Sequence, residues 1–144
     1  MMESPEFVLD SSVALGWMFE DERDEYSGAV LRQLSESVAL VPWLWHSEVG
    51  NILANAVKYS RITMAAAAQA LDNAADLRIE TVSLNEHAGF WMSRALDFKL
   101  TTYDAQYLEL ALRRQLPLAS KDKDLITAAQ LHGVSLWKPA IREI

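Results

Sequence analysis

Hydrophobic and polar positions alternate along the chain in blocks that predict strands alternating with helices. Short apolar runs bounded by polar residues or prolines predict strands at residues 7–9, 38–41, 78–82, 118–120 and 134–137. Between these runs, apolar residues recur at helical spacing, which is typical of amphipathic helices. The expected helices span residues 13–19, 26–36, 43–60, 63–76, 83–99, 103–115 and 122–132.

Helix boundaries follow from residues that cap or interrupt helices. Asp10 and the serines after it are good N-cap residues, and Pro42 suits the entry to the helix over residues 43–60. Ser83 with Glu86 has the spacing of a capping box, which predicts a helix start there. Pro117 ends the preceding helix, because the residue before a proline disfavours the helical conformation.

This order predicts a three-layer α/β fold, with a mostly parallel sheet flanked by helices. Such sheets bind ligands outside the carboxyl ends of their strands. Asp10 ends the first strand, and Asp122 follows the strand at residues 118–120. We therefore expect both carboxylates at the same edge of the sheet.

Composition narrows the class of protein without changing the predicted fold. A chain of 144 residues with 51% hydrophobic and 23% charged residues fits one globular domain over residues 1–144. The chain has no cysteine, which excludes disulfides, thiolate metal sites and a cysteine nucleophile. No apolar run reaches the roughly 18 residues of a membrane helix, so we expect a cytoplasmic protein.

The formal net charge of −7 disfavours a protein that holds duplex nucleic acid on a broad basic face. It does not exclude a nuclease. Carboxylates that hold divalent cations count as negative in this sum, although the loaded site presents positive charge to a phosphate. The acidic balance also favours a basic partner.

Glu48 is the most informative acid, because it lies inside a predicted helix among apolar residues. Asn51 and Asn55 share its helical face and make a polar track. A solvated face is the structural alternative. The neighbouring tryptophans Trp43 and Trp45 predict a buried helix instead, which favours a functional role for Glu48.

The aspartates each have a structural explanation, since an aspartate at a helix start caps the helix or interacts with its dipole. Asp10, Asp104 and Asp122 all stand at predicted helix starts. Gathered with Glu48 at one sheet edge, however, they would repel one another and resist ionising without a cation. Hard oxygen ligands favour Mg²⁺ or Mn²⁺, and such ions support phosphodiester hydrolysis.

Four ordered motifs resemble the PIN-domain family, and within it the VapC-type toxin ribonucleases of toxin–antitoxin pairs. They are V-L-D-S-S at residues 8–12, S-E-V-G-N-I-L at 47–53, T-T-Y-D-A-Q-Y-L-E-L-A at 101–111 and L-A-S-K-D-K-D-L at 118–125. Together they cover nearly the whole chain. The resemblance implies a PIN-like fold and metal ligation by Asp10, Glu48, Asp104 and Asp122.

Other positions of these motifs are expected to support or flank the site. Ser11, Asn51 and Ser120 are the expected supporting residues, with Ser120 standing where the family more often has threonine. Gly50 departs from the usual alanine, at a cost of up to about 1 kcal/mol in helix propensity. Asp124 is an extra acid that we expect to face solvent.

The resemblance implies an endoribonuclease that depends on Mg²⁺ or Mn²⁺ and acts as the toxin of a VapBC-type pair. RNA is the expected substrate, a VapB-type antitoxin the expected partner, and a homodimer the expected assembly. No motif identifies the RNA or its cut site, because sequence-specific reading of RNA depends on loops and shape.

Two alternatives stay open at this point. A phosphoacceptor receiver-like domain also places carboxylates at strand ends, but Ser83 follows the third strand where the acceptor aspartate would stand. A non-catalytic PIN-like interaction module usually lacks one or more of the acids, and here all four are present. The five tryptophans are expected in the core or at an interface.

Overall fold

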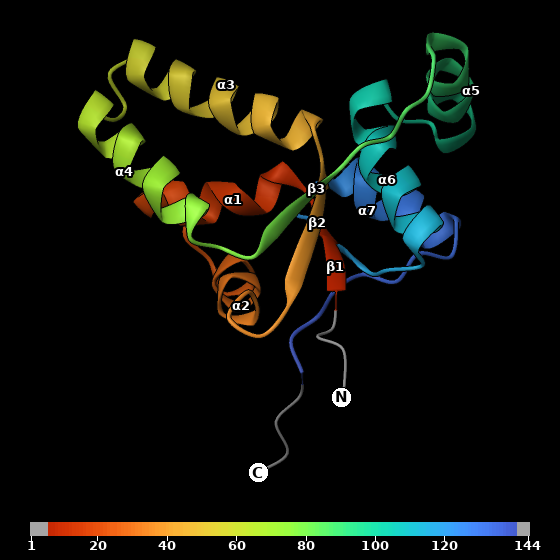
Figure 1. Cartoon of the computed structure of the whole chain (residues 1–144), viewed down its shortest axis with the longest axis horizontal. Coiled ribbons are helices and arrows are strands. Elements are labelled where there is room, and N and C mark those ends of the chain that lie inside the picture. The colour runs from red at the N-terminus through yellow and green to blue at the C-terminus, as the bar shows by residue number, and fades with distance from the viewer. Residues whose placement is uncertain (1–5, 141–144) are drawn as a thin grey trace.

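The computed structural model describes residues 6–140 (Figure 1). The single domain expected over residues 1–144 extends beyond this range and stays a prediction. The elements are β1 (Glu6–Leu9), α1 (Ser11–Met18), a short 3-10 helix η1 (Glu20–Glu22), α2 (Glu25–Gln33), β2 (Val38–Pro42), α3 (Leu44–Lys58), α4 (Met64–Ala75), β3 (Ile79–Val82), α5 (Ala88–Phe98), α6 (Thr102–Arg114), β4 (Leu118–Ala119) and α7 (Lys123–Leu131).

The four strands form one parallel sheet in the order β3-β2-β1-β4. Val8 in β1 pairs with Leu40 on one side and with Leu118 on the other. Helices α1 to α4 lie on one side of the sheet and α5 to α7 on the other (Figure 1). The expected α/β fold with a parallel sheet between helical layers is confirmed.

Burial of apolar side chains holds these layers together. The interior residues of β1, β2 and β4 are almost completely buried, and α6 carries six buried residues, which include Tyr107. Strand β3 is an edge strand whose residues are half-buried or exposed. The centre of the sheet therefore provides a rigid support for the residues at its carboxyl edge.

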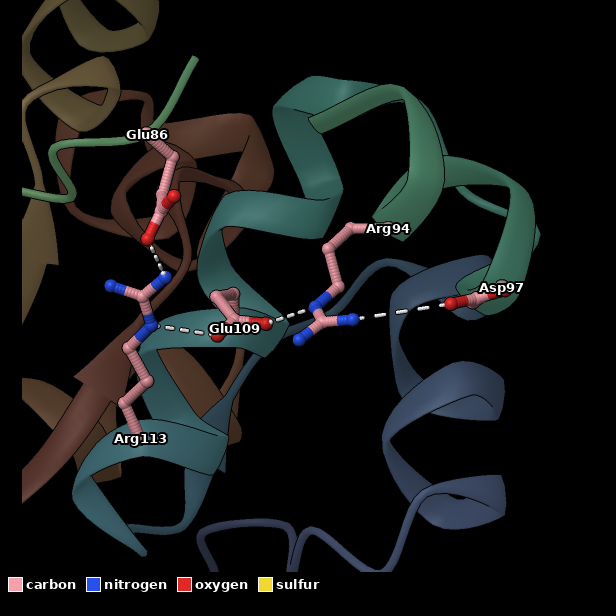
Figure 2. A network of polar contacts seen from close by, with 5 residues as sticks. All are labelled: Glu86, Arg94, Asp97, Glu109 and Arg113. Carbon is pink, nitrogen blue, oxygen red and sulfur yellow. Dashed lines mark hydrogen bonds and ion pairs between the residues drawn. The ribbon is translucent and has the colours of Figure 1, made fainter. Parts of the chain in front are cut away.

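Helix α5 is fastened to α6 by an ion-pair network around the buried Glu109 (Figure 2). Arg94 Nε of α5 donates to Glu109 Oε1 at 2.6 Å, and Arg113 Nε of α6 donates to Oε2 at 2.7 Å. Arg113 Nη2 also donates to Oε1 of Glu86, which lies in the loop before α5. Arg94 Nη1 lies 3.9 Å from Asp97 Oδ2. The carboxylate of Glu109 is thus compensated by two guanidinium groups.

The capping box predicted from Ser83 and Glu86 is wrong. Helix α5 begins at Ala88, with His87 at its N-cap position. Both polar side chains have distant partners instead: Ser83 Oγ accepts from Trp43 Nε1 at 3.1 Å, and Glu86 Oε1 accepts from Arg113 at 2.7 Å. Tertiary hydrogen bonds have outweighed the local capping preference.

Two further expectations are corrected. The strand expected at residues 134–137 is reduced to one bridge between Leu118 and Leu136. Trp43 was expected in a buried helix but is 63% exposed, whereas Trp45 is 4% exposed. Trp43 stands before the first turn of α3, so the helical periodicity that buries Trp45 does not bury it.

None of the helices in the described range is long and apolar enough to cross a membrane. The cytoplasmic location stays a prediction.

Candidate functional site

The carboxyl ends of β1 and β4 bring the first and last motifs together. Asp10 directly follows β1, Ser120 directly follows β4, and the Asp10 N–H donates to the Ala119 carbonyl at 3.0 Å. This backbone hydrogen bond extends the pairing of two neighbouring strands by one step. It fixes the position of Asp10 relative to the segment that carries Ser120 and Asp122.

Asp10 occupies the N-cap position of α1, but its side chain makes no capping hydrogen bond. Its Oδ2 instead accepts from Ser12 Oγ at 2.6 Å and from Ser120 Oγ at 2.8 Å. The residue is only 3% exposed. Helix capping therefore does not explain this buried carboxylate, and both hydroxyl groups leave Oδ1 as the oxygen available to a ligand.

Glu48 points from α3 toward the same region and does not lie on a solvated face. Its Oε1 accepts hydrogen bonds from Ser11 Oγ at 3.2 Å and from Tyr107 Oη at 2.5 Å. Three elements, α1, α3 and α6, thus meet at one carboxylate oxygen. Burial and the adjacent Glu48 raise the pKa of Tyr107, so the phenol keeps its proton and acts as a donor.

Tyr107 was not singled out from the sequence, although it lies in the third motif. It is fully buried and lies three residues after Asp104, so both side chains share one face of α6. The sequence did contain a signal for Tyr107, because it is a polar aromatic residue one helical turn after the candidate ligand Asp104.

Asp104 lies in the first turn of α6 and is half-buried. Thr101 supplies the helix cap, since its Oγ1 accepts from the Asp104 N–H at 3.1 Å. Burial raises the pKa of Asp104 to about 6, and the charges of the surrounding acids add to this effect; in decreasing order they are Asp122, Asp10, Glu48 and Asp124. The carboxylate of Asp104 therefore does not cap α6, and the charges of all four acidic neighbours affect its pKa.

Asp122 retains a structural role as well. Its Oδ1 caps α7 by accepting from the Leu125 N–H at 3.0 Å, and its own N–H donates to Ser120 Oγ at 3.0 Å. Burial raises the pKa of Asp10, against the hydrogen bonds from its two serines, and the charges of Glu48 and Asp122 raise it further. The four acids thus lie within mutual electrostatic range.

The donor chemistry of this cluster fits a hard divalent cation, because all four side chains offer carboxylate oxygens. In their present conformations, no three histidine or acidic side chains within residues 6–140 converge closely enough to enclose one ion. Glu48 is held by Tyr107 and Ser11, and one oxygen of Asp122 is used by the helix cap.

A family model described as the PIN domain matches residues 7–131. The chain belongs to the PIN domain family. PIN domains are generally nucleases and typically bind divalent metals.

Solved structures similar to this PIN domain support the fold. The structure of PAE2754 from Pyrobaculum aerophilum is 21% identical, with a TM-score of 0.64 over 87% of this chain and 80% of that chain. The structure of VapBC2 from Rickettsia felis, bound to a DNA fragment from its promoter, is 10% identical, with a TM-score of 0.65 over 92% and 97%. A domain from Methanocaldococcus jannaschii is 16% identical, with a TM-score of 0.52 over 97% and 96%. No curated protein sequence matches the chain.

The remaining expected residues of this PIN domain fall outside the cluster. Asn51 and Asn55 are exposed, and across residues 6–140 no side-chain hydrogen bond joins Asn51 to the acids. A supporting role for Asn51 stays a prediction. Asp124 is exposed, as expected, although its charge contributes to the raised pKa of Asp104. His46 contacts Thr81 instead of Glu48, which agrees with their different sides of α3.

Proposed function

We propose that this PIN domain is a divalent-metal-dependent endoribonuclease whose metal ligands are Asp10, Glu48, Asp104 and Asp122. One observation carries the proposal. Within residues 6–140 none of the four carboxylates forms an ion pair, and the charges of Asp122, Asp10 and Glu48 add to burial in raising the pKa of Asp104 to about 6. A bound cation would relieve this repulsion.

Mg²⁺ or Mn²⁺ at this site would polarise a phosphoryl oxygen and supply an activated water molecule. The chain's own residues prepare for this role. Ser12 and Ser120 both donate to Oδ2 of Asp10, so Oδ1 is the oxygen left for an ion. Ser11 and Tyr107 hold Oε1 of Glu48, so Oε2 is the oxygen offered to an ion.

Asp104 provides a charge that responds to metal. With its pKa raised to about 6, a fraction of this carboxyl group is protonated near neutral pH. Metal binding would favour the ionised form and release the proton. Asp122 can ligate through Oδ2 while Oδ1 continues to cap α7.

We further propose that the protein is the toxin of a VapBC-type pair. The support is the fold shared with VapBC2 from Rickettsia felis. A VapB-type antitoxin with a basic segment would suit the net charge of −7, since complementary charge favours association. RNA is the proposed substrate and a homodimer the proposed assembly.

The test of the nuclease is cleavage of labelled RNA by the purified protein with Mg²⁺ or Mn²⁺ and again in excess EDTA. We expect cleavage only with metal, and its loss in Asp10→Asn. The matched control is Asp72→Asn, which removes an exposed acid of α4 and should cleave like the wild type. Undiminished cleavage in EDTA would contradict the proposal. A stable protein that binds Mn²⁺ but cleaves no RNA would favour the non-catalytic interaction module.

A further inference from the structure

Trp43 is an exposed aromatic residue at the same sheet edge as the acids. It directly follows β2, as Asp10 follows β1 and Ser120 follows β4, so all three lie at carboxyl ends of parallel strands. Its side chain is 63% exposed, whereas that of Trp45 is 4% exposed. The large apolar indole is therefore mostly exposed, and its residue lies at the sheet edge that carries the candidate site.

The indole is anchored although it is exposed. Its Nε1 donates to Ser83 Oγ at 3.1 Å, and Ser83 is the first residue after β3. The ring of His46 lies beside it, with centroids 5.6 Å apart and planes inclined by 47°. Thr81 Oγ1 lies 2.8 Å from Nε2 of that histidine. A ring held in this way loses little conformational freedom when another ring stacks on it.

Trp43 contacts polar side chains, which argues against a protein-docking patch at this position. Such patches are contiguous apolar surfaces, whereas the contacts of Trp43 are to Ser83 and His46. A groove of about 520 Å³ extends from Ser83; its lining residues are Leu40, Glu80, Thr81, Val82, Ser83 and Arg114. Across residues 6–140, Arg114 forms no ion pair, so its guanidinium is available to a phosphate.

We infer that Trp43 is a stacking platform for a base of single-stranded RNA next to the scissile phosphate, with Ser83 fixing the plane of the indole. The inference rests on the proposed ribonuclease function and adds a substrate-binding residue to it. Trp43 follows β2, which pairs with β1, and Asp10 follows β1, so the two residues stand at adjacent strand ends. Aromatic stacking of unpaired bases is a general means of binding single-stranded RNA.

The experiment measures KM and kcat for RNA cleavage in Trp43→Ala, Trp43→Phe and the wild type. Anisotropy of a short labelled oligoribonucleotide in EDTA gives Kd without cleavage. We expect Trp43→Ala to raise KM and Kd about 5- to 160-fold with kcat unchanged, because one stacked base is lost. Trp43→Phe should recover most of the affinity. The matched control is Tyr59→Ala at the far end of α3, where an aromatic residue 72% exposed should be replaced without effect.

Ser83→Ala supplies a second test that keeps Trp43 in place. It should raise KM by a smaller factor, and it should have no further effect in a Trp43→Ala background, because the hydrogen bond acts only through the indole. Additive effects of the two changes would contradict the positioning role of Ser83.

Wild-type KM and Kd in Trp43→Ala would overturn the inference while leaving the nuclease proposal intact. Unchanged RNA affinity combined with loss of self-association would also overturn it and assign Trp43 to a protein interface. Binding that depends on Trp43 without any cleavage by the wild type would support the platform and refute the nuclease.

Discussion

Two groups of buried or half-buried carboxylates in this PIN domain differ in how their charge is compensated. Glu109 is held by the guanidinium groups of Arg94 and Arg113 (Figure 2). Within residues 6–140, the side-chain donors to Asp10 and Glu48 are hydroxyl groups alone, those of serines and of Tyr107. The first arrangement is electrostatically complete within the chain. The second leaves negative charge without a cationic partner among residues 6–140, and this difference is the reason why we propose that an external cation binds there.

Removing the compensated carboxylate should have the largest effect on stability. Glu109→Gln leaves two guanidinium groups without their shared partner, and its side chain is only 6% exposed. We expect a loss of about 3 kcal/mol in the free energy of unfolding, at the lower end of the range for a broken buried pair because both arginines are partly exposed. Urea denaturation measures it. A change below about 0.5 kcal/mol would remove the contrast between the two groups.

Bound metal should stabilise the folded protein, and it should do so through the uncompensated acids and not through Glu109. Mn²⁺ at about one hundred times its Kd should add about 2.7 kcal/mol to the free energy of unfolding, because it binds the native state preferentially. Thermal denaturation at increasing Mn²⁺ concentration measures the effect. The shift in Tm should disappear in Asp104→Asn and persist in Glu109→Gln. Equal shifts in both variants would place the metal elsewhere.

Asp104 should make stability depend on pH in a defined direction. Its pKa is raised from 3.8 to about 6, so the folded state binds its proton more tightly than the unfolded chain. The protonated carboxyl group of Asp104 therefore contributes to the free energy of unfolding. This contribution is fully present below pH 3.8 and is lost as the pH rises through about 6. Without metal, Asp104→Asn should therefore gain about 1 kcal/mol at neutral pH, after allowance for solvent screening of a half-buried group.

The control for Asp104→Asn is the same comparison well below pH 3.8, where both side chains are neutral in the folded and the unfolded state and the difference should vanish. A destabilised Asp104→Asn at neutral pH would show that the carboxylate is compensated in the metal-free protein.

The smallest expected effect concerns the loop that joins β4 to α7. Lys121 Nζ lies 2.8 Å from Asp24 Oδ2, and this pair ties the loop carrying Ser120 and Asp122 to α2. Both side chains are partly exposed, so Lys121→Met should cost only about 0.5 kcal/mol of stability. We expect a weaker Mn²⁺ affinity, measured by titration calorimetry. Unchanged affinity in Lys121→Met would show that the pair does not position the loop.

The sequence predicted most of the fold, because the alternation of apolar runs and helical spacing is a local property. It also predicted which acids follow β1 and β4, since the position of a strand end determines the sheet edge that a residue occupies. The start of α5 could not be predicted in this way. Ser83 and Glu86 have their partners 40 and 27 residues away, and no local pattern records those contacts.

The same limit applies within the candidate site. Glu48 was identified because a charged residue interrupts an apolar helix, but its contact with Tyr107 joins residues 59 positions apart. The exposure of Trp43 was missed, because a tryptophan beside Trp45 has the same apolar pattern whether it faces the core or solvent.

The most direct test of the four-acid site is titration of Mn²⁺ into Glu48→Gln, with RNA cleavage measured in the same preparation. Glu48 lies inside α3 and has no capping role, so its effects on folding and on metal binding can be separated. We predict a folded variant, at least as stable as the metal-free wild type, that has lost both Mn²⁺ binding and cleavage. Wild-type Mn²⁺ affinity and cleavage in Glu48→Gln would contradict the assignment of the site.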